Sequence, residues 1–193
     1  MKKFVTLLLV ALFASTAFAG LDNGPDSFGV YFDTAGNTND LDGVMPFAPF
    51  NVYLLLMNPT GATNGFECTV TPVGAPHFIL GTTLGGTGAL DVDSSANGFA
   101  VGAAADYPIA GGAMLLVTWQ FMVQSTAQLE WRISKASIPS MPGDLPVVTG
   151  NGVLRRCGVA SGSVTAPVAY VNSPDAPVAT EVSSFGNVKS LFR

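Results

Sequence analysis

The chain has 193 residues, of which 48% are hydrophobic and only 11% are charged, and its formal net charge at pH 7 is −5. This acidic balance argues against nucleic-acid binding, which needs a basic surface, and the hydrophobic content argues against disorder. A chain of this length can form one domain with a well-filled core.

Residues 1–19 have the pattern of a secretory signal peptide. Lys2 and Lys3 precede an apolar run over residues 4–13, and Ala17-Phe18-Ala19 is a small-x-small cleavage site. A membrane anchor is disfavoured because the run is shorter than the ~20 residues of a spanning helix. Cleavage would remove both lysines and change the formal charge to about −7. We therefore expect an exported protein, extracellular, on the cell surface or periplasmic, with no integral membrane span after cleavage.

Residues 20–172 predict an all-β domain, because short apolar stretches alternate with Gly-, Pro- and Asn-rich breaks and no long amphipathic helix occurs. The expected strands are 28–33, 50–57, 65–71, 77–81, 89–92, 99–103, 114–123, 127–133, 145–149, 153–159 and 167–171. This spacing is typical of a sandwich or a barrel, and we expect a two-sheet antiparallel β-sandwich.

The strand over residues 114–123 is the longest and the most apolar of the set. At period two, one of its faces carries only apolar side chains, namely Leu115, Val117, Trp119, Phe121 and Val123. We expect this strand to lie centrally in a sheet and to pair with residues 127–133 as a hairpin.

The spacing of hydrophobic residues changes near the end of the chain. Residues 173–182 form a Pro-containing linker, and residues 183–193 place Phe185, Val188 and Phe192 near one helical face. Because so short a helix is marginal in isolation, these side chains should bury against the domain itself or a partner.

Cys68 and Cys157 are the only cysteines. An even pair in an exported chain predicts one disulfide, although two buried free thiols remain the alternative. Cys68 falls on the inward face of its strand, so such a disulfide would be buried.

An oxygen-rich loop is the candidate for a metal site. Its side chains are of the kind that Ca²⁺ prefers, but their spacing is not that of an EF-hand, and turn chemistry explains the same composition. The residues concerned are Asp33, Asn37, Asn39, Asp40 and Asp42. No other cofactor is expected.

Catalytic patterns are weak. His77 is the only histidine and has no nucleophile motif near it in the sequence, and one histidine with two cysteines does not make a typical zinc site. The acids available to a glycosidase have no distinguishing context; they are Asp91, Asp93, Asp106, Glu67 and Glu130. We expect no enzyme.

Aromatic residues could stack on sugars. Trp119 and Trp131 lie on apolar strand faces, so we expect them in the core. Tyr107 precedes Pro108 in a loop and is the tyrosine that we expect to be exposed, and so the candidate glycan contact. Tyr53 and Tyr170 are the other aromatic candidates.

Residues 50–123 carry the series FNVYLLLMNPT, NGFECTVTP, a Gly-rich excursion and GGAMLLVTWQFMV. This series resembles the cohesin-like and carbohydrate-binding-like β-sandwiches of exported bacterial proteins, which implies a cohesin-like or jelly-roll-like fold. The whole chain also looks like uncharacterised exported bacterial proteins with the segments FGVYFD, GFEC, SIPSMPGD and FGNVKSLFR in this order.

The resulting hypothesis is a non-enzymatic exported β-sandwich protein for adhesion, surface assembly or protein interaction, with a protein or polysaccharide at the cell surface as its partner. The alternative is a carbohydrate-binding module, and a distant alternative is a glycoside hydrolase-like enzyme.

Overall fold

The computed structural model describes residues 21, 22 and 24–173. These residues form thirteen strands in two sheets, and this part of the chain contains no helix. The predicted signal peptide, most of the predicted linker and the predicted C-terminal helix, with Phe185, Val188 and Phe192, lie outside the described residues. The all-β prediction is confirmed for the described part, and the domain boundaries stay predictions.

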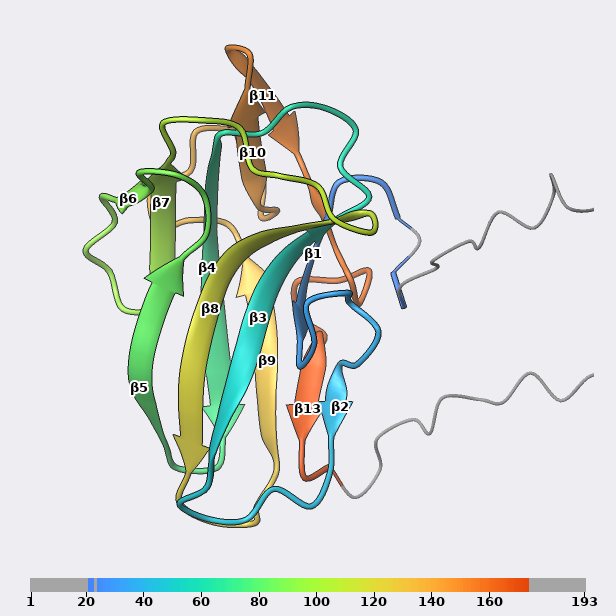
Figure 1. The fold of residues 1–193 in the computed structure, drawn as a ribbon, viewed down its shortest axis with the longest axis vertical. Helices are drawn as coiled ribbons and strands as arrows, with labels where there is room; N and C mark the ends of the chain where they lie inside the picture. The colour runs from blue at the N-terminus through green and yellow to red at the C-terminus, as the bar shows by residue number, and fades with distance from the viewer. Residues whose placement is uncertain (1–20, 23, 174–193) are drawn as a thin grey trace, which may run out of the picture.

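One sheet, called sheet A, has five strands in the order β12-β1-β3-β8-β5. It forms the front layer in Figure 1. Its strands are β1 (Ser27–Tyr31), β3 (Pro49–Met57), β5 (His77–Leu84), β8 (Ala113–Val123) and β12 (Gly158–Val159).

The second sheet, called sheet B, lies behind sheet A in Figure 1. Its main order is β11-β10-β4-β9-β13-β2, and β7 pairs with β4 and carries β6 on its other side. Its strands are β2 (Asp40–Leu41), β4 (Gly65–Gly74), β6 (Leu90–Asp91), β7 (Gly98–Gly102), β9 (Leu129–Ser134), β10 (Val147–Gly150), β11 (Val153–Arg156) and β13 (Ala169–Val171).

Both sheets are mixed, which corrects the prediction of an antiparallel fold. β1 pairs with β12 in parallel, and β13 pairs with β2 in parallel. Each parallel pair joins strands that are distant in sequence, so no tight turn connects them. β2 was missed because it lies within residues 34–43, which the sequence predicts to be a loop.

The core lies between the two sheets and is rich in aromatic side chains. Phe28 of sheet A packs on Phe66 of sheet B, and Phe121 packs edge-to-face on Trp131 with ring centroids 5.4 Å apart. Trp119 is 5% exposed and Trp131 1% exposed, which confirms that both tryptophans belong to the core. Aromatic contacts of this kind stabilise the fold by more than the buried apolar area alone would.

β8 contains an irregularity that the period-two pattern does not reveal. Leu54 of β3 pairs with Val117 and Leu55 pairs with Leu115, so Leu116 is an extra residue. Leu116 and Val117 are both buried in the core between the sheets, whereas Leu115 packs on the opposite side of sheet A. The predicted face is therefore correct from Val117 onward and wrong at Leu115, because a bulge reverses the side on which residues point.

The predicted hairpin between β8 and residues 127–133 is also wrong. β8 pairs with β3 and β5 in sheet A, and β9 pairs with β4 and β13 in sheet B. The connection after Val123 therefore crosses from one sheet to the other. The alternating burial of β9 would be the same in either arrangement, because only the inward face is specified by hydrophobicity.

One end of sheet A is buried on both sides. Tyr31, Leu55 and Met57 form a second, small cluster on its outer face. The loop after β1 covers this cluster, since a side chain at Gly36 would touch Met57 and Leu55. The edge strand β5 on the other side of the sheet is more open, since its residues 78–83 are all exposed.

Candidate functional site

Two of the residues considered for catalysis, His77 and Glu130, make local contacts with their neighbours. The Nδ1 atom of His77 lies 2.9 Å from the carbonyl oxygen of Ala75, and the imidazole packs on Phe121 with centroids 5.5 Å apart. Glu130 accepts hydrogen bonds from Arg132. Neither arrangement presents a proton-transfer pair to a cavity.

Asp91 and Asp93 organise the turn between β6 and β7. Asp91 accepts hydrogen bonds from the backbone amides of Asp93 and Ala100, and Asp93 accepts one from Ser95. The hydrogen bonds from Ser95 hold the pKa of Asp93 below its usual value, so this carboxylate is ionised at neutral pH.

The two cysteines both lie in the core and are not bonded to each other in this structure. Burial raises the pKa of the Cys68 thiol well above its usual value, and burial together with the charge of Asp26 raises the pKa of Cys157 to about 12. Both thiols are therefore protonated and unreactive in the folded chain. The predicted disulfide is not found, and it stays a prediction for the oxidised protein.

The candidate calcium loop folds as a turn. The carboxylate of Asp33 accepts hydrogen bonds from the amides of Ala35 and Asn37, and the Asn39 side chain donates to the carbonyl oxygen of Val168. Asp40 lies on β2, and Asp42 follows this strand in the chain. Among the described residues, no three acidic, histidine or cysteine side chains gather as a metal site. Calcium binding stays a prediction.

Tyr107 is buried, with 2% of its surface exposed, so the prediction that it is exposed is wrong, while its contact with a glycan stays a prediction. Its ring packs on Phe66 and against Gly86, and its amide donates to the carbonyl of Thr63 at 2.7 Å. The loop folds back onto the core because this ring fills space there, and burial raises the pKa of the phenol to about 12.

A buried ion pair, which sequence reasoning missed, joins the start of the domain to β11. Asp26 accepts hydrogen bonds from Arg155 and Thr60, and Arg155 also donates to the carbonyl of Ala62 and the hydroxyl of Thr63. Burial alone would raise the pKa of Asp26, but the hydrogen bonds and the Arg155 charge together hold it below its usual value. This network links the residue before β1 and the chain after β3 to β11.

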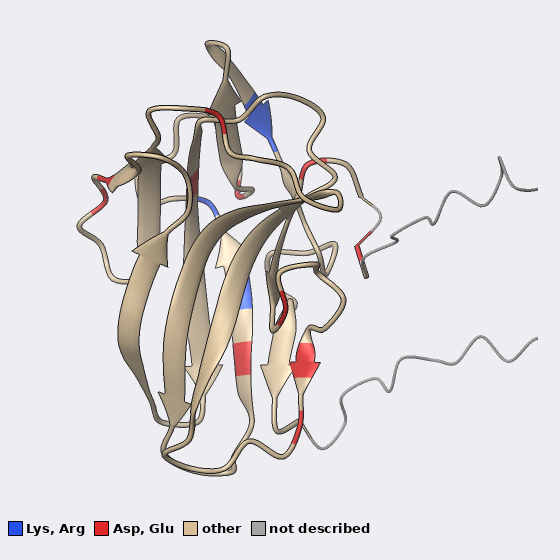
Figure 2. Ribbon diagram, viewed as in Figure 1, with Lys and Arg blue, Asp and Glu red and all other residues tan. Residues whose placement is uncertain are grey.

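Charged side chains are segregated between the two sheets. The five strands of sheet A contain no Asp, Glu, Lys or Arg. Every charged strand residue belongs to sheet B, as Figure 2 shows by the uniform tan of β3, β5 and β8. The charged strand residues are Asp40, Glu67, Asp91, Glu130, Arg132, Arg155 and Arg156.

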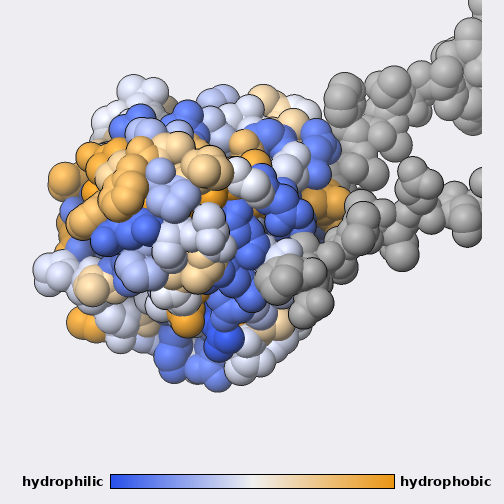
Figure 3. Space-filling view, turned by 90° about the horizontal axis from the view of Figure 1, so that it is seen from below, coloured by the Kyte–Doolittle hydropathy of each residue, from blue (hydrophilic) through white to orange (hydrophobic). Residues whose placement is uncertain are grey.

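The uncharged sheet has exposed hydrophobic side chains at one end, which we call the apolar end. Phe78, Ile79 and Leu80 of β5 are 48%, 42% and 46% exposed, and Met45 and Phe47 before β3 are 65% and 63% exposed. The amide of Phe47 donates to Val123, the residue that pairs with His77 on the other side of β8. The space-filling view shows hydrophobic surface gathered on one side of this end (Figure 3).

Phe47 has an unusual backbone conformation, with φ at 64°. This left-handed region is an outlier for a bulky side chain and costs on the order of 1–2 kcal/mol. A strained backbone that holds a large aromatic ring in solvent gains nothing from burial. The strain and exposure of Phe47 therefore favour an interaction role for the apolar end.

β5 is also one of the two edge strands of sheet A, so one side of its backbone is unpaired within the sheet. Natural edge strands are protected by charges, prolines or bulges. β5 has no charged residue and no proline, and its one protective feature is the bulge between Ile79 and Gly81. The apolar end and this edge together form the best candidate for a functional surface.

Among the described residues, no helix has the length and apolar character needed to cross a membrane.

No protein-family model matches the chain, and no curated protein matches it. Among solved structures, the sixth cohesin of scaffoldin B from Acetivibrio cellulolyticus, in complex with a mutant Cel5 dockerin, is similar with a TM-score of 0.38. The sequences are 13% identical, and the similarity covers 76% of this chain and 98% of the cohesin. With so low a TM-score the likeness is weak, and it establishes neither the fold family nor the function of this chain.

Proposed function

We propose that this protein is an exported, non-enzymatic β domain that assembles with a second copy of itself through the uncharged sheet A. The single observation that carries the proposal is the absence of charge from all five strands of sheet A, combined with the exposed apolar end. Contiguous exposed apolar surface marks interaction sites, and the centres of protein interfaces are depleted in charge.

The net charge restricts the surface through which a second copy could bind. The formal charge is −5 for the full chain and about −7 without residues 1–19, so two copies repel each other wherever charged surfaces meet. Sheet A is the surface that avoids this repulsion. A symmetric contact places the same patch on both copies, and the free edge of β5 can add antiparallel backbone hydrogen bonds to the side-chain contact.

Sedimentation equilibrium of residues 20–193 over a range of concentrations tests the proposal. The wild type should associate, and Phe78→Lys should weaken association at least about tenfold, because a charge is costly in a desolvated contact. Val153→Lys is the matched control: Val153 is 57% exposed but lies on β11 of sheet B.

Two outcomes would contradict this function. The wild type could remain monomeric at all concentrations, or both lysine variants could associate as the wild type does. Saturable binding on a glycan array would instead support the carbohydrate-binding alternative. For that alternative Tyr107 does not offer an exposed ring.

A further inference from the structure

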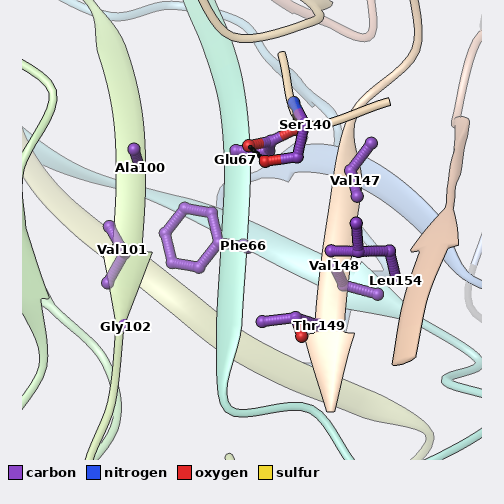
Figure 4. A pocket seen from close by; sticks show the side chains of 10 residues that line it. All are labelled: Phe66, Glu67, Ala100, Val101, Gly102, Ser140, Val147, Val148, Thr149 and Leu154. Atoms are coloured by element: carbon purple, nitrogen blue, oxygen red, sulfur yellow. Dashed lines mark hydrogen bonds between the residues drawn. The ribbon is translucent and has the colours of Figure 1, made fainter. Parts of the chain in front are cut away.

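The outer face of sheet B contains a groove, away from the surface considered so far. It lies over β4, β7 and β10 and has a volume of about 240 Å³ (Figure 4). The groove exists because small residues stand where side chains would otherwise fill it. Ala100 and Gly102 line it, and a Cβ atom added at Gly102 would meet no atom within 4 Å.

One carboxylate, that of Glu67, is held in this groove. The backbone amide of Ser140 donates to one oxygen of Glu67 at 2.7 Å, and the Ser140 hydroxyl donates to the other at 2.7 Å. Figure 4 shows Glu67 and Ser140 side by side at one end of the groove. None of the ion pairs among the described residues includes Glu67. Its charge is therefore oriented but not neutralised.

A second hollow, with a volume of about 350 Å³, adjoins the first, and Ala100 lines both. It contains Asp93, which accepts a hydrogen bond from the Ser137 hydroxyl at 3.0 Å. Ser137 and Ser140 belong to the same loop between β9 and β10, so one loop holds both acids. The two hollows share Ala100 and are together called the two-part groove.

The two-part groove combines negative charge with apolar walls. The charged residues that line it, Glu67 and Asp93, are both acidic. Leu154 lines the first part and is 45% exposed, and Ile138 lines the second part and is 86% exposed. Such a site complements a side chain with an aliphatic stem and a cationic head.

We propose that this groove binds an extended basic segment of a partner protein, with a lysine side chain in the Glu67 part. The lysine stem lies along Val147 and Leu154, and the ammonium group donates to Glu67. Lysine is favoured over arginine because Ser140 already occupies one acceptor site on each oxygen of Glu67. A single ammonium donor needs one of the remaining sites, whereas the planar arginine fork needs two that are aligned. A second cationic side chain of the same segment lies next to Asp93.

Fluorescence anisotropy with labelled, end-blocked short peptides tests the proposal. One peptide carries lysine at alternate positions, and the matched peptides carry arginine or norleucine there. The lysine peptide should bind best. Glu67→Gln should weaken its binding about fivefold, as expected for one partly exposed charge pair. Gly102→Leu should prevent binding by filling the groove while leaving every charge unchanged.

Asp106→Asn is the matched control for charge, because Asp106 is exposed and lies outside the groove. It should bind the lysine peptide as the wild type does. The proposal is overturned if the lysine peptide does not bind, if norleucine or arginine serves equally well, or if Asp106→Asn weakens binding as much as Glu67→Gln. Gly102→Leu also distinguishes loss of binding from loss of folding. Because a Cβ atom at this position has no atom within 4 Å, the variant should fold and fail only in peptide binding.

Discussion

Arg155→Met should destabilise the domain strongly, because it leaves Asp26 buried without its cation. The Asp26 side chain is 10% exposed and that of Arg155 19% exposed, and their closest N–O distance is 3.1 Å. Removing one partner of a buried ion pair costs about 3–5 kcal/mol. For a domain of this size, we expect the melting temperature to fall by roughly 10 °C.

The destabilisation should depend on pH in a defined direction. The folded pKa of Asp26 lies below the ordinary value of 3.8, so its ionised form stabilises the fold above that value. This contribution is lost as the pH falls through the folded pKa. The wild type should therefore lose stability below about pH 4, and the difference between wild type and Arg155→Met should shrink there.

Urea unfolding of wild type, Arg155→Met, Asp26→Asn and the double variant measures these effects. Asparagine tolerates the positive φ of 45° at position 26, so the backbone there is preserved. The two single changes should couple by about 2 kcal/mol, within the range for directly contacting residues. Additive losses, or a loss below about 1 kcal/mol in Arg155→Met, would refute the reasoning, since surface pairs have that magnitude.

Three further changes test other parts of the structure. Gly150→Ala should destabilise by more than about 3 kcal/mol in urea unfolding, because its new Cβ would lie 1.8 Å from the carbonyl oxygen of Ala62; an unchanged midpoint would contradict this packing. Phe47→Asn should leave the melting temperature equal or higher, since asparagine accepts the left-handed backbone, while association weakens; a lower melting temperature would show that the ring is structural. Cys68 and Cys157 should resist alkylation in the folded reduced protein and react once it is unfolded, and the intact mass of secreted protein should change on reduction if the predicted disulfide forms.

Much of the strand pattern could be predicted from the sequence because it depends on local chemistry. The β10–β11 hairpin is an example. Gly150 pairs with Val153 across a two-residue turn, and Asn151 and Gly152 have φ values of 53° and 73°. Asn-Gly is the pair that such a turn favours.

The arrangement of strands in the sheets could not be predicted in the same way, because it depends on distant partners. The alternation in β9 shows which face is inward, but not that β4, and not β8, is the neighbour. The bulge at Leu116 likewise accommodates a mismatch between β8 and β3, and nothing in MLLVTWQFMV indicates it.

The candidate surface illustrates the same limit. The segment HFILGTTL has the composition of other strands of the chain, but β5 lies at an edge of its sheet, and Phe78 and Ile79 are 48% and 42% exposed. Tyr107 is the opposite case: its position in a loop predicted exposure, but its ring packs on Phe66 and is buried. Exposure is a property of the assembled sheets and cannot be assigned from residue type alone.

The segregation of charge between the sheets has a consequence for valency. Two copies joined through sheet A would together carry two acidic grooves, one on the sheet B of each copy. Such a pair could crosslink two basic segments, or hold two segments of one chain, and the second binding event would then be intramolecular. Two grooves that each bind weakly would thereby hold the partner for longer than one groove does. Diluting the protein until the pair dissociates would abolish this gain.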